Sequence, residues 1–216
     1  GNLRARQGDL DAARAAYREA LQLAQAAGEP LLEALAHNNA AYHALLAADL
    51  ADARAHLGAG LALAERPDLA LARQWLYSTA GEVALAEERW DEAESWHRRA
   101  LAEAEAQGNP EQVANARANL GRVERGLGRP REAGLLLAAA AASAARLNAP
   151  FLQARIALEQ ADAALARGDV AEAEAALDRA EPQLAGRGYA ALEARAAALR
   201  EALRAASAGP RSRRRA

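Results

Sequence analysis

Residues 8–21 read GDLDAARAAYREAL, and related versions of this stretch return along the chain. The later versions are ADLADARAHLGAGL at 48–61, ERWDEAESWHRRAL at 88–101, GRPREAGLLLAAAA at 128–141 and GDVAEAEAALDRAE at 168–181. One alanine keeps its place in all five, and its number rises by the same step each time (53 − 13 = 40): Ala13, Ala53, Ala93, Ala133 and Ala173. Self-similarity at a fixed period of this length predicts stacked two-helix units, which bury their apolar faces against their neighbours.

Other columns of the repeat alternate between small and large side chains. Four residues after each alanine stands a larger residue: Tyr17, Leu57, His97, Leu137 and Leu177, of which His97 is the outlier. Twelve residues before each alanine stands a small one: Gly1, Ala41, Gly81, Gly121 and Ala161. Spacings of three, four and seven residues keep side chains on one helical face. These columns therefore predict seams in which small residues let two helices approach and large residues fill the gaps.

Helix-breaking residues follow the same period. Pro30, Pro110 and Pro150 are multiples of 40 apart, each where a first helical turn is expected, whereas Pro67 is displaced by three residues. A second break precedes each alanine, as at Gly168-Asp169, where Gly suits the end of one helix and Asp the start of the next. Two breaks per period predict two helices per period.

These runs resemble tetratricopeptide repeats. The resemblance is carried by residues 8–21 and 89–101, by Asn119-Leu-Gly121 with residues 129–133, and by residues 168–173. It implies an all-α, right-handed α-solenoid of helix-turn-helix repeats in one domain over residues 1–208. We expect about five units, at 1–29, 30–67, 68–109, 110–149 and 150–187, then a capping helix at 188–208 and a basic flexible tail at 209–216.

The length of the repeat indicates which subgroup of the family the chain resembles. The family's usual period is about 34 residues, so a period of 40 predicts longer helices. Such long repeats resemble those of bacterial signalling proteins of the maltose-regulon activator type and related large ATP-dependent regulators. Gly1 corresponds to Gly81, in the middle of a first helix, so we expect that half a helix is missing and that the chain is a piece of something larger.

Packing is expected to weaken toward the C-terminus. Ala141 and Glu181 stand where earlier units have leucine, and residues 138–142 are all alanine. Glu124 also lies where the family has an aromatic or apolar residue. We therefore expect the second and third units to be the best packed.

Composition excludes several classes of protein. The chain has 216 residues, 52% of them hydrophobic and 26% charged, with no cysteine for a disulfide or a thiolate metal site. Its apolar runs are too short to cross a membrane. The net charge of −2 argues against a nucleic-acid-binding surface. We expect a cytoplasmic protein without a cofactor, which does not bind membranes.

The resemblance also indicates where a partner would bind. In tetratricopeptide proteins, the face of each first helix opposite the seam lines a concave groove. In this chain that face and its flank predict a peptide- or partner-binding groove with ten residues: Asn38, Asn39, Tyr42, Trp75, Ser78, Glu82, Asn115, Asn119, Arg122 and Arg155.

Each kind of candidate residue has a second interpretation. Asparagine is a poor residue for a helix interior, and its amide matches the peptide groups of an extended ligand, but it can equally be solvated or cap a loop. Tyr42 and Trp75 suit interface anchors or burial between hairpins. Arg122 and Arg155 suit a bound carboxylate or phosphate, although Glu159 and Asp162 are placed to neutralise them. The cations by which some relatives hold the C-terminal carboxylates of chaperones have no counterpart at Asn38, Tyr42 and Trp75.

The sequence does not indicate an enzyme. It has no glycine-rich phosphate loop and no nucleophile motif. His37 and His43 point to different sides of a helix, and a metal site with His56 lacks a converging carboxylate. The leading hypothesis is a non-catalytic module that binds a protein or peptide within a larger bacterial regulatory protein. The alternatives are a domain that senses a small-molecule effector, or a scaffold that self-associates through its open first unit.

Overall fold

The protein is entirely α-helical, apart from its turns and one short 3₁₀-helix, over residues 10–208, the part that a computed structural model describes. The helices are α2 (Leu10–Ala27), α3 (Pro30–Leu46), α4 (Leu50–Ala64), η1 (Pro67–Leu69), α5 (Ala70–Ala86), α6 (Trp90–Ala106), α7 (Pro110–Gly126), α8 (Pro130–Arg146), α9 (Pro150–Ala166), α10 (Val170–Leu184) and α11 (Ala190–Ala208). All the α-helices of this range begin at one constant spacing, from Leu10, Pro30 and Leu50 onward to Ala190. The backbone therefore repeats twice within each period of the sequence.

Most connections are the same tight turn. One residue of each lies in the left-handed region, with φ between 48° and 74°: Gly28, Ala48, Glu88, Gly108, Gly128, Asn148 and Gly168. The amide of the residue after it donates back to the last helical turn, as when Asp49 N donates to Ala44 O at 2.9 Å. Asp49 and Asp169 then cap the next helix by accepting from the amides of Asp52 and Glu172. At the displaced Pro67, η1 replaces the turn, and α5 still begins in register.

Two of these turns use an unfavourable residue. Ala48 and Glu88 both have φ of 58°, a conformation that costs an L side chain about 1 kcal/mol and glycine almost nothing. Replacing either residue by glycine is expected to raise the free energy of unfolding by up to about 1 kcal/mol in urea denaturation. The control is Ala47→Gly, because Ala47 has an ordinary φ of −84°. That variant should be no more stable than the wild type, and equal effects at positions 47 and 48 would contradict the prediction.

The seams are built from the predicted columns. The five anchor alanines are at most 1% exposed. A Cβ added to Gly121 of α7 would lie 2.8 Å from Cγ of Leu137 on α8, so the small residue receives the large one, as expected. Gly81 of α5 receives His97 of α6 in the same way.

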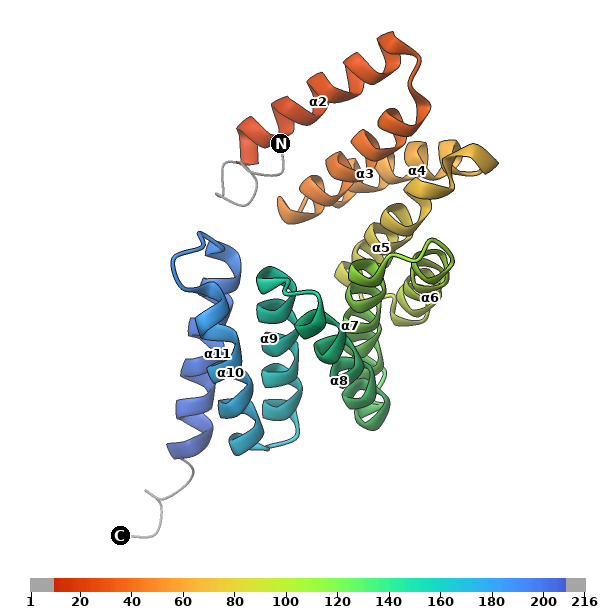
Figure 1. Ribbon diagram of the computed structural model, residues 1–216. Coiled ribbons are helices and arrows are strands. Elements are labelled where there is room, and N and C mark those ends of the chain that lie inside the picture. Colours follow the sequence, from red (N-terminus) through yellow and green to blue (C-terminus); the bar gives the residue numbers. More distant parts are fainter. Residues whose placement is uncertain (1–9, 209–216) are drawn as a thin grey trace, which may run out of the picture.

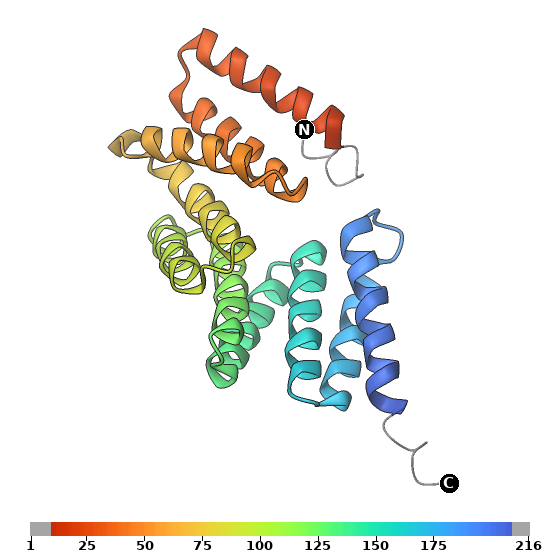
Figure 2. The ribbon, with the colours of Figure 1, turned by 180° about the vertical axis from the view of Figure 1, so that it is seen from behind.

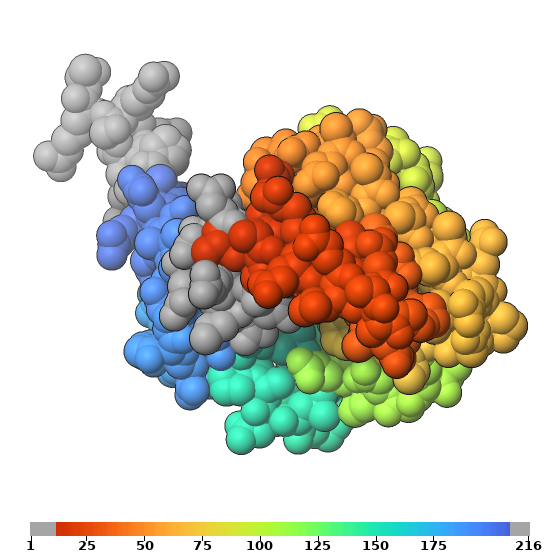
Figure 3. Space-filling view, turned by 90° about the horizontal axis from the view of Figure 1, so that it is seen from above, coloured from red at the N-terminus to blue at the C-terminus, as the bar shows by residue number. Residues whose placement is uncertain are grey.

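The helices stack in sequence order, and each first helix also packs against the next first helix, as α3 does against α5. The stack curves, so that α2 and α11 lie on the same side of the molecule (Figures 1 and 2). Seen from above, the chain runs round the molecule from α2 through α5 and α7 to α11 (Figure 3).

The expectation of weak packing is wrong for the fifth unit. The largest apolar cluster of the described residues lies between α9, α10 and α11, and includes the fully buried Leu158 and Leu177. α11 adds Leu203 and, at its edge, Leu192 and Leu199. These leucines supply the volume that the alanine-rich sequence of the fifth unit lacks.

Two predictions fall outside the described residues: the truncated first helix at Gly1 and the basic tail at 209–216. The predicted unit boundaries lie in connections between the helix pairs, or in η1 for residue 67. Within residues 10–208, no helix is both long enough and apolar enough to cross a membrane.

Candidate functional site

The structure brings all ten candidate residues together around one groove of about 470 Å³. The first helices α3, α5, α7 and α9 supply them from equivalent positions, such as Tyr42, Glu82 and Arg122, which are one repeat period apart. The groove has ten further lining residues: Tyr17, His43, Leu46, Thr79, Phe151, Glu159, Tyr189, Ala191, Leu192 and Arg195. Because Tyr17 belongs to α2 and Arg195 to α11, both ends of the curved stack enclose the same space.

Aromatic side chains gather in this groove. The chain has eight aromatic residues (three Trp, four Tyr and one Phe), and five of them line it. Tyr42 is 45% exposed and Trp75 is 38% exposed, so these two are not buried between hairpins. At the other end, Phe151 and Tyr189 make an edge-to-face contact with centroids 5.2 Å apart. The groove therefore combines accessible apolar rings with polar side chains, as binding sites generally do.

A row of alternating charges runs across the first helices. Both carboxylate oxygens of Glu82 accept from Arg122 at 2.9 Å. Arg122 also lies 3.5 Å from Glu159, which accepts from Arg195 at 2.6 Å. The row links α5, α7, α9 and α11. It ties the groove wall to the last helix of the stack.

The acids of this row are ionised. Burial is the largest single influence on the Glu82 carboxyl and would raise its pKa, but the charges of Arg122, His97 and Arg155 and the hydrogen bond from Arg122 together lower the pKa. Burial opposes ionisation of Glu159 too, and its pKa is lowered by the hydrogen bond from Arg195 and by nearby arginines. The lining as a whole has three arginines and two glutamates, so its charge is positive.

Arg155 orients two of the candidate amides. It donates to Asn119 Oδ1 at 2.8 Å and also to Asn115 Oδ1. Thr79 donates in the same way to Asn38 Oδ1 at 2.8 Å. The carbonyl oxygens of these three asparagines are thus engaged, and their N–H₂ groups are the donors that remain. The side chain of Asn39 has no hydrogen-bond partner among the described residues.

The prediction of internal neutralisation holds for one of the two arginines. Arg122 is neutralised, although mainly by Glu82, and Asp162 pairs with Arg125 instead. Arg155 is partnered by amide and carbonyl oxygens of the described residues. Arg195 is not among the groove residues predicted from the sequence. Arg195 stands one period after Arg155, at the position equivalent to Trp75. The same spacing, continued into the last helix, would have identified it.

The groove continues into an apolar trough of about 570 Å³ along the last turns of the first helices. Leu45, Leu85 and Trp90 line the trough, and Tyr42 and Glu82 line both spaces. The groove and the trough together form a longer accessible surface than a compact small molecule would fill.

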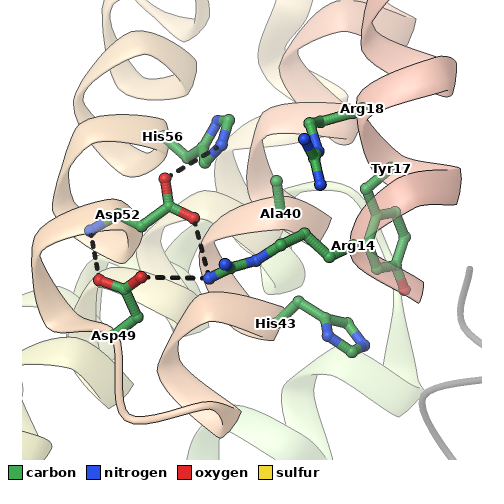
Figure 4. A pocket seen from close by; sticks show the side chains of 8 residues that line it. All are labelled: Arg14, Tyr17, Arg18, Ala40, His43, Asp49, Asp52 and His56. Carbon is green, nitrogen blue, oxygen red and sulfur yellow. Dashed lines mark hydrogen bonds and ion pairs between the residues drawn. The ribbon is translucent and has the colours of Figure 1, made fainter. Parts of the chain in front are cut away.

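A smaller cavity of about 260 Å³ lies between α2 and the pair α3 and α4 (Figure 4). There Arg14 reaches Asp49 at 3.1 Å and Asp52 at 3.5 Å, while Asp52 also faces His56 (Figure 4). The ion pairs of Arg14 with Asp49 and Asp52 join α2 to the start of α4.

The histidines do not form a three-ligand site. His37 and His56 approach with their Nδ1 atoms 3.0 Å apart, whereas the ring of His43 packs on that of Tyr17. In the part of the chain that the structure describes, no group of three or more side chains could hold a metal ion.

Stacked helical hairpins around a concave groove define the class of fold, an α-solenoid. Residues 73–146 match the tetratricopeptide repeat family, and the antiparallel helix pairs of the chain are tetratricopeptide repeats. The fold is similar to the crystal structure of BtubC (BKLC) from P. vanneervenii, with a TM-score of 0.65 and 20% identity over 96% of each chain. A sequence search of the curated proteins finds no match. Neither the family match nor the structural match supports the expected resemblance to bacterial regulators of the maltose-regulon activator type.

Proposed function

We propose that the protein binds an extended segment of a partner protein in the groove between α2 and α11. The observation that carries the proposal is the gathering of five of the eight aromatic side chains, with four asparagines, in one groove. The amide N–H₂ groups of Asn39 and Asn115, which are the partly exposed asparagines of the four, suit the backbone carbonyls of an extended segment. The positive lining favours a segment with acidic side chains, and the trough beside Leu45 and Leu85 suits an apolar side chain further along it. A place within a larger bacterial regulator stays a prediction.

Trp75 provides the test. Peptides are first selected from a random phage-displayed library against the wild-type protein, and their affinity is then measured by calorimetry. Trp75→Ala is expected to weaken binding at least about tenfold, because accessible aromatic anchors dominate such interfaces. Leu71→Ala is the matched control, since Leu71 lies one turn earlier on α5, is 58% exposed and does not line the groove. Equal affinity of both variants, with unchanged helicity, would remove the groove from consideration.

A second candidate is the binding of a small effector. It is favoured by the enclosure of the groove, to which α2 contributes Tyr17 and α11 contributes Arg195. A metabolite that raises the melting temperature of the wild type but not of Arg195→Ala would support it. The trough beside the groove favours the extended segment over a small effector, because it lengthens the accessible surface.

A further inference from the structure

His97 is an unusual occupant of a helix seam. Its side chain is fully buried, and neither ring nitrogen has a hydrogen-bond partner among the described residues. A Cβ on Gly81 would overlap its Cε1 and lie 2.5 Å from its Nε2. The imidazole is therefore pressed against the backbone of α5.

Packing alone does not call for a histidine here. Leu137 fills the equivalent seam of the next unit against Gly121, the counterpart of Gly81. Leucine gives the same kind of contact without two buried, unpaired nitrogens, which are unfavourable. The titratable ring at position 97 is the difference between two otherwise equivalent seams.

The charged groups that act on His97 belong to the groove. They are Glu82 of α5, Arg122 of α7 and Arg155 of α9. Glu82 follows Gly81 directly and is bound by Arg122. Burial lowers the pKa of His97 from 6.5 to about 4, Glu82 opposes this, and the two arginines add to it.

We propose that His97 is an acid-responsive positioning residue for the groove: its neutral ring keeps α6 seated on α5, and a proton on the ring disrupts that seat. An imidazolium carries two N–H donors, and Glu82 is the negative group that acts on this ring. Protonation thus forces Glu82 away from Arg122 or expels the ring from the seam. Either change alters the groove wall, so a ligand bound there is released by acid; this last consequence rests on the proposed function.

The sign of the pH dependence follows from linkage. An unfolded chain binds a proton on this histidine below pH 6.5, while the folded protein resists the proton until about pH 4. The contribution to stability is therefore complete above pH 6.5 and is lost as the pH falls toward 4. For one proton, the folding equilibrium constant drops by up to about tenfold per pH unit.

The first experiment compares urea unfolding of the wild type and His97→Leu from pH 7.5 to pH 4.5. Other titrating groups are common to both proteins, so the ratio of their folding equilibrium constants isolates His97. Below pH 6.5, the folding equilibrium constant of the wild type divided by that of His97→Leu is expected to decrease as the pH falls. The decrease should approach about tenfold per pH unit. The same pH dependence in both proteins would overturn the proposal.

Two further measurements separate the possible failures. In NMR titrations of the wild type, which need no variant, the His97 ring is expected to stay neutral down to pH 5. Titration near pH 6.5 with an unchanged folded spectrum would overturn the proposal. For a library-selected peptide, affinity should fall between pH 5.5 and pH 4, where the folded protein takes up the proton, and should fall more in the wild type than in His97→Leu. If no peptide binds at pH 7.5, the proposed function fails, and unfolding and NMR still decide the role of His97.

Discussion

Gly81→Ala is expected to lower the free energy of unfolding by about 2 kcal/mol, although alanine normally strengthens a helix. The added Cβ would meet three atoms of the fully buried His97 ring, with Nε2 at 2.5 Å and Cδ2 at 2.7 Å, so the ring or the backbone of α5 would have to shift. Gly58→Ala is the matched control. Gly58 lies inside α4 with nothing within 4 Å of an added Cβ, so this variant should gain up to about 1 kcal/mol.

Urea denaturation of both variants at neutral pH measures the difference. The same substitution should have opposite signs at the two sites, because one glycine is required by a neighbouring helix and the other is not. If Gly81→Ala is as stable as Gly58→Ala, the seam between α5 and α6 is looser than the structure describes.

Arg195→Ala is expected to cost about 2–3 kcal/mol of stability. Glu159 is 2% exposed, and its Oε1 accepts from Arg195 at 2.6 Å. Its Oε2 already lacks a hydrogen-bond partner among the described residues. Removing the arginine leaves a buried carboxylate whose remaining ion-pair partner, Arg122, is 3.5 Å away and shared with Glu82.

Arg200→Ala is the control for this prediction, since Arg200 is on the same helix and pairs with the exposed Asp178 and Glu181. It should cost less than about 1 kcal/mol. Adding Glu159→Gln to Arg195→Ala should recover part of the loss, because a neutral amide is easier to bury than a charge. Equal losses for Arg195→Ala and Arg200→Ala would show that the buried carboxylate does not depend on this partner.

The repeat period predicts most of the fold. Alanines and glycines one period apart identify the seams, and Pro110 and Pro150 identify helix starts, because steric fit between helices constrains these positions directly. The same columns also assemble the ten candidate residues, since equivalent positions on stacked helices must lie side by side. Whether those residues bind a partner is a separate question, to be decided by experiments such as Trp75→Ala.

Other features depend on contacts that no local pattern specifies. Arg155 donates to the side chains of Asn115 and Asn119 rather than to a carboxylate, and the repeat period does not specify this choice. The strength of the C-terminal core depends on leucines of α11, which lie outside the fourth and fifth units. The enclosure of the groove by Tyr17 and Arg195 depends on the summed curvature of all the units. Each of these is a property of the assembled stack.

That curvature gives the regular spacing of the helices a wider consequence. Since every unit adds the same pair of helices and nearly the same connections, each adds a similar rotation to the stack. The copy number of units then determines whether the first and last helices face each other. Loss of one unit would turn α11 away from α2 and leave an open trough, and gain of one would carry α11 past it. Duplication or deletion of a unit would thus change both the span of the groove and the set of side chains that line it, because each first helix contributes lining residues.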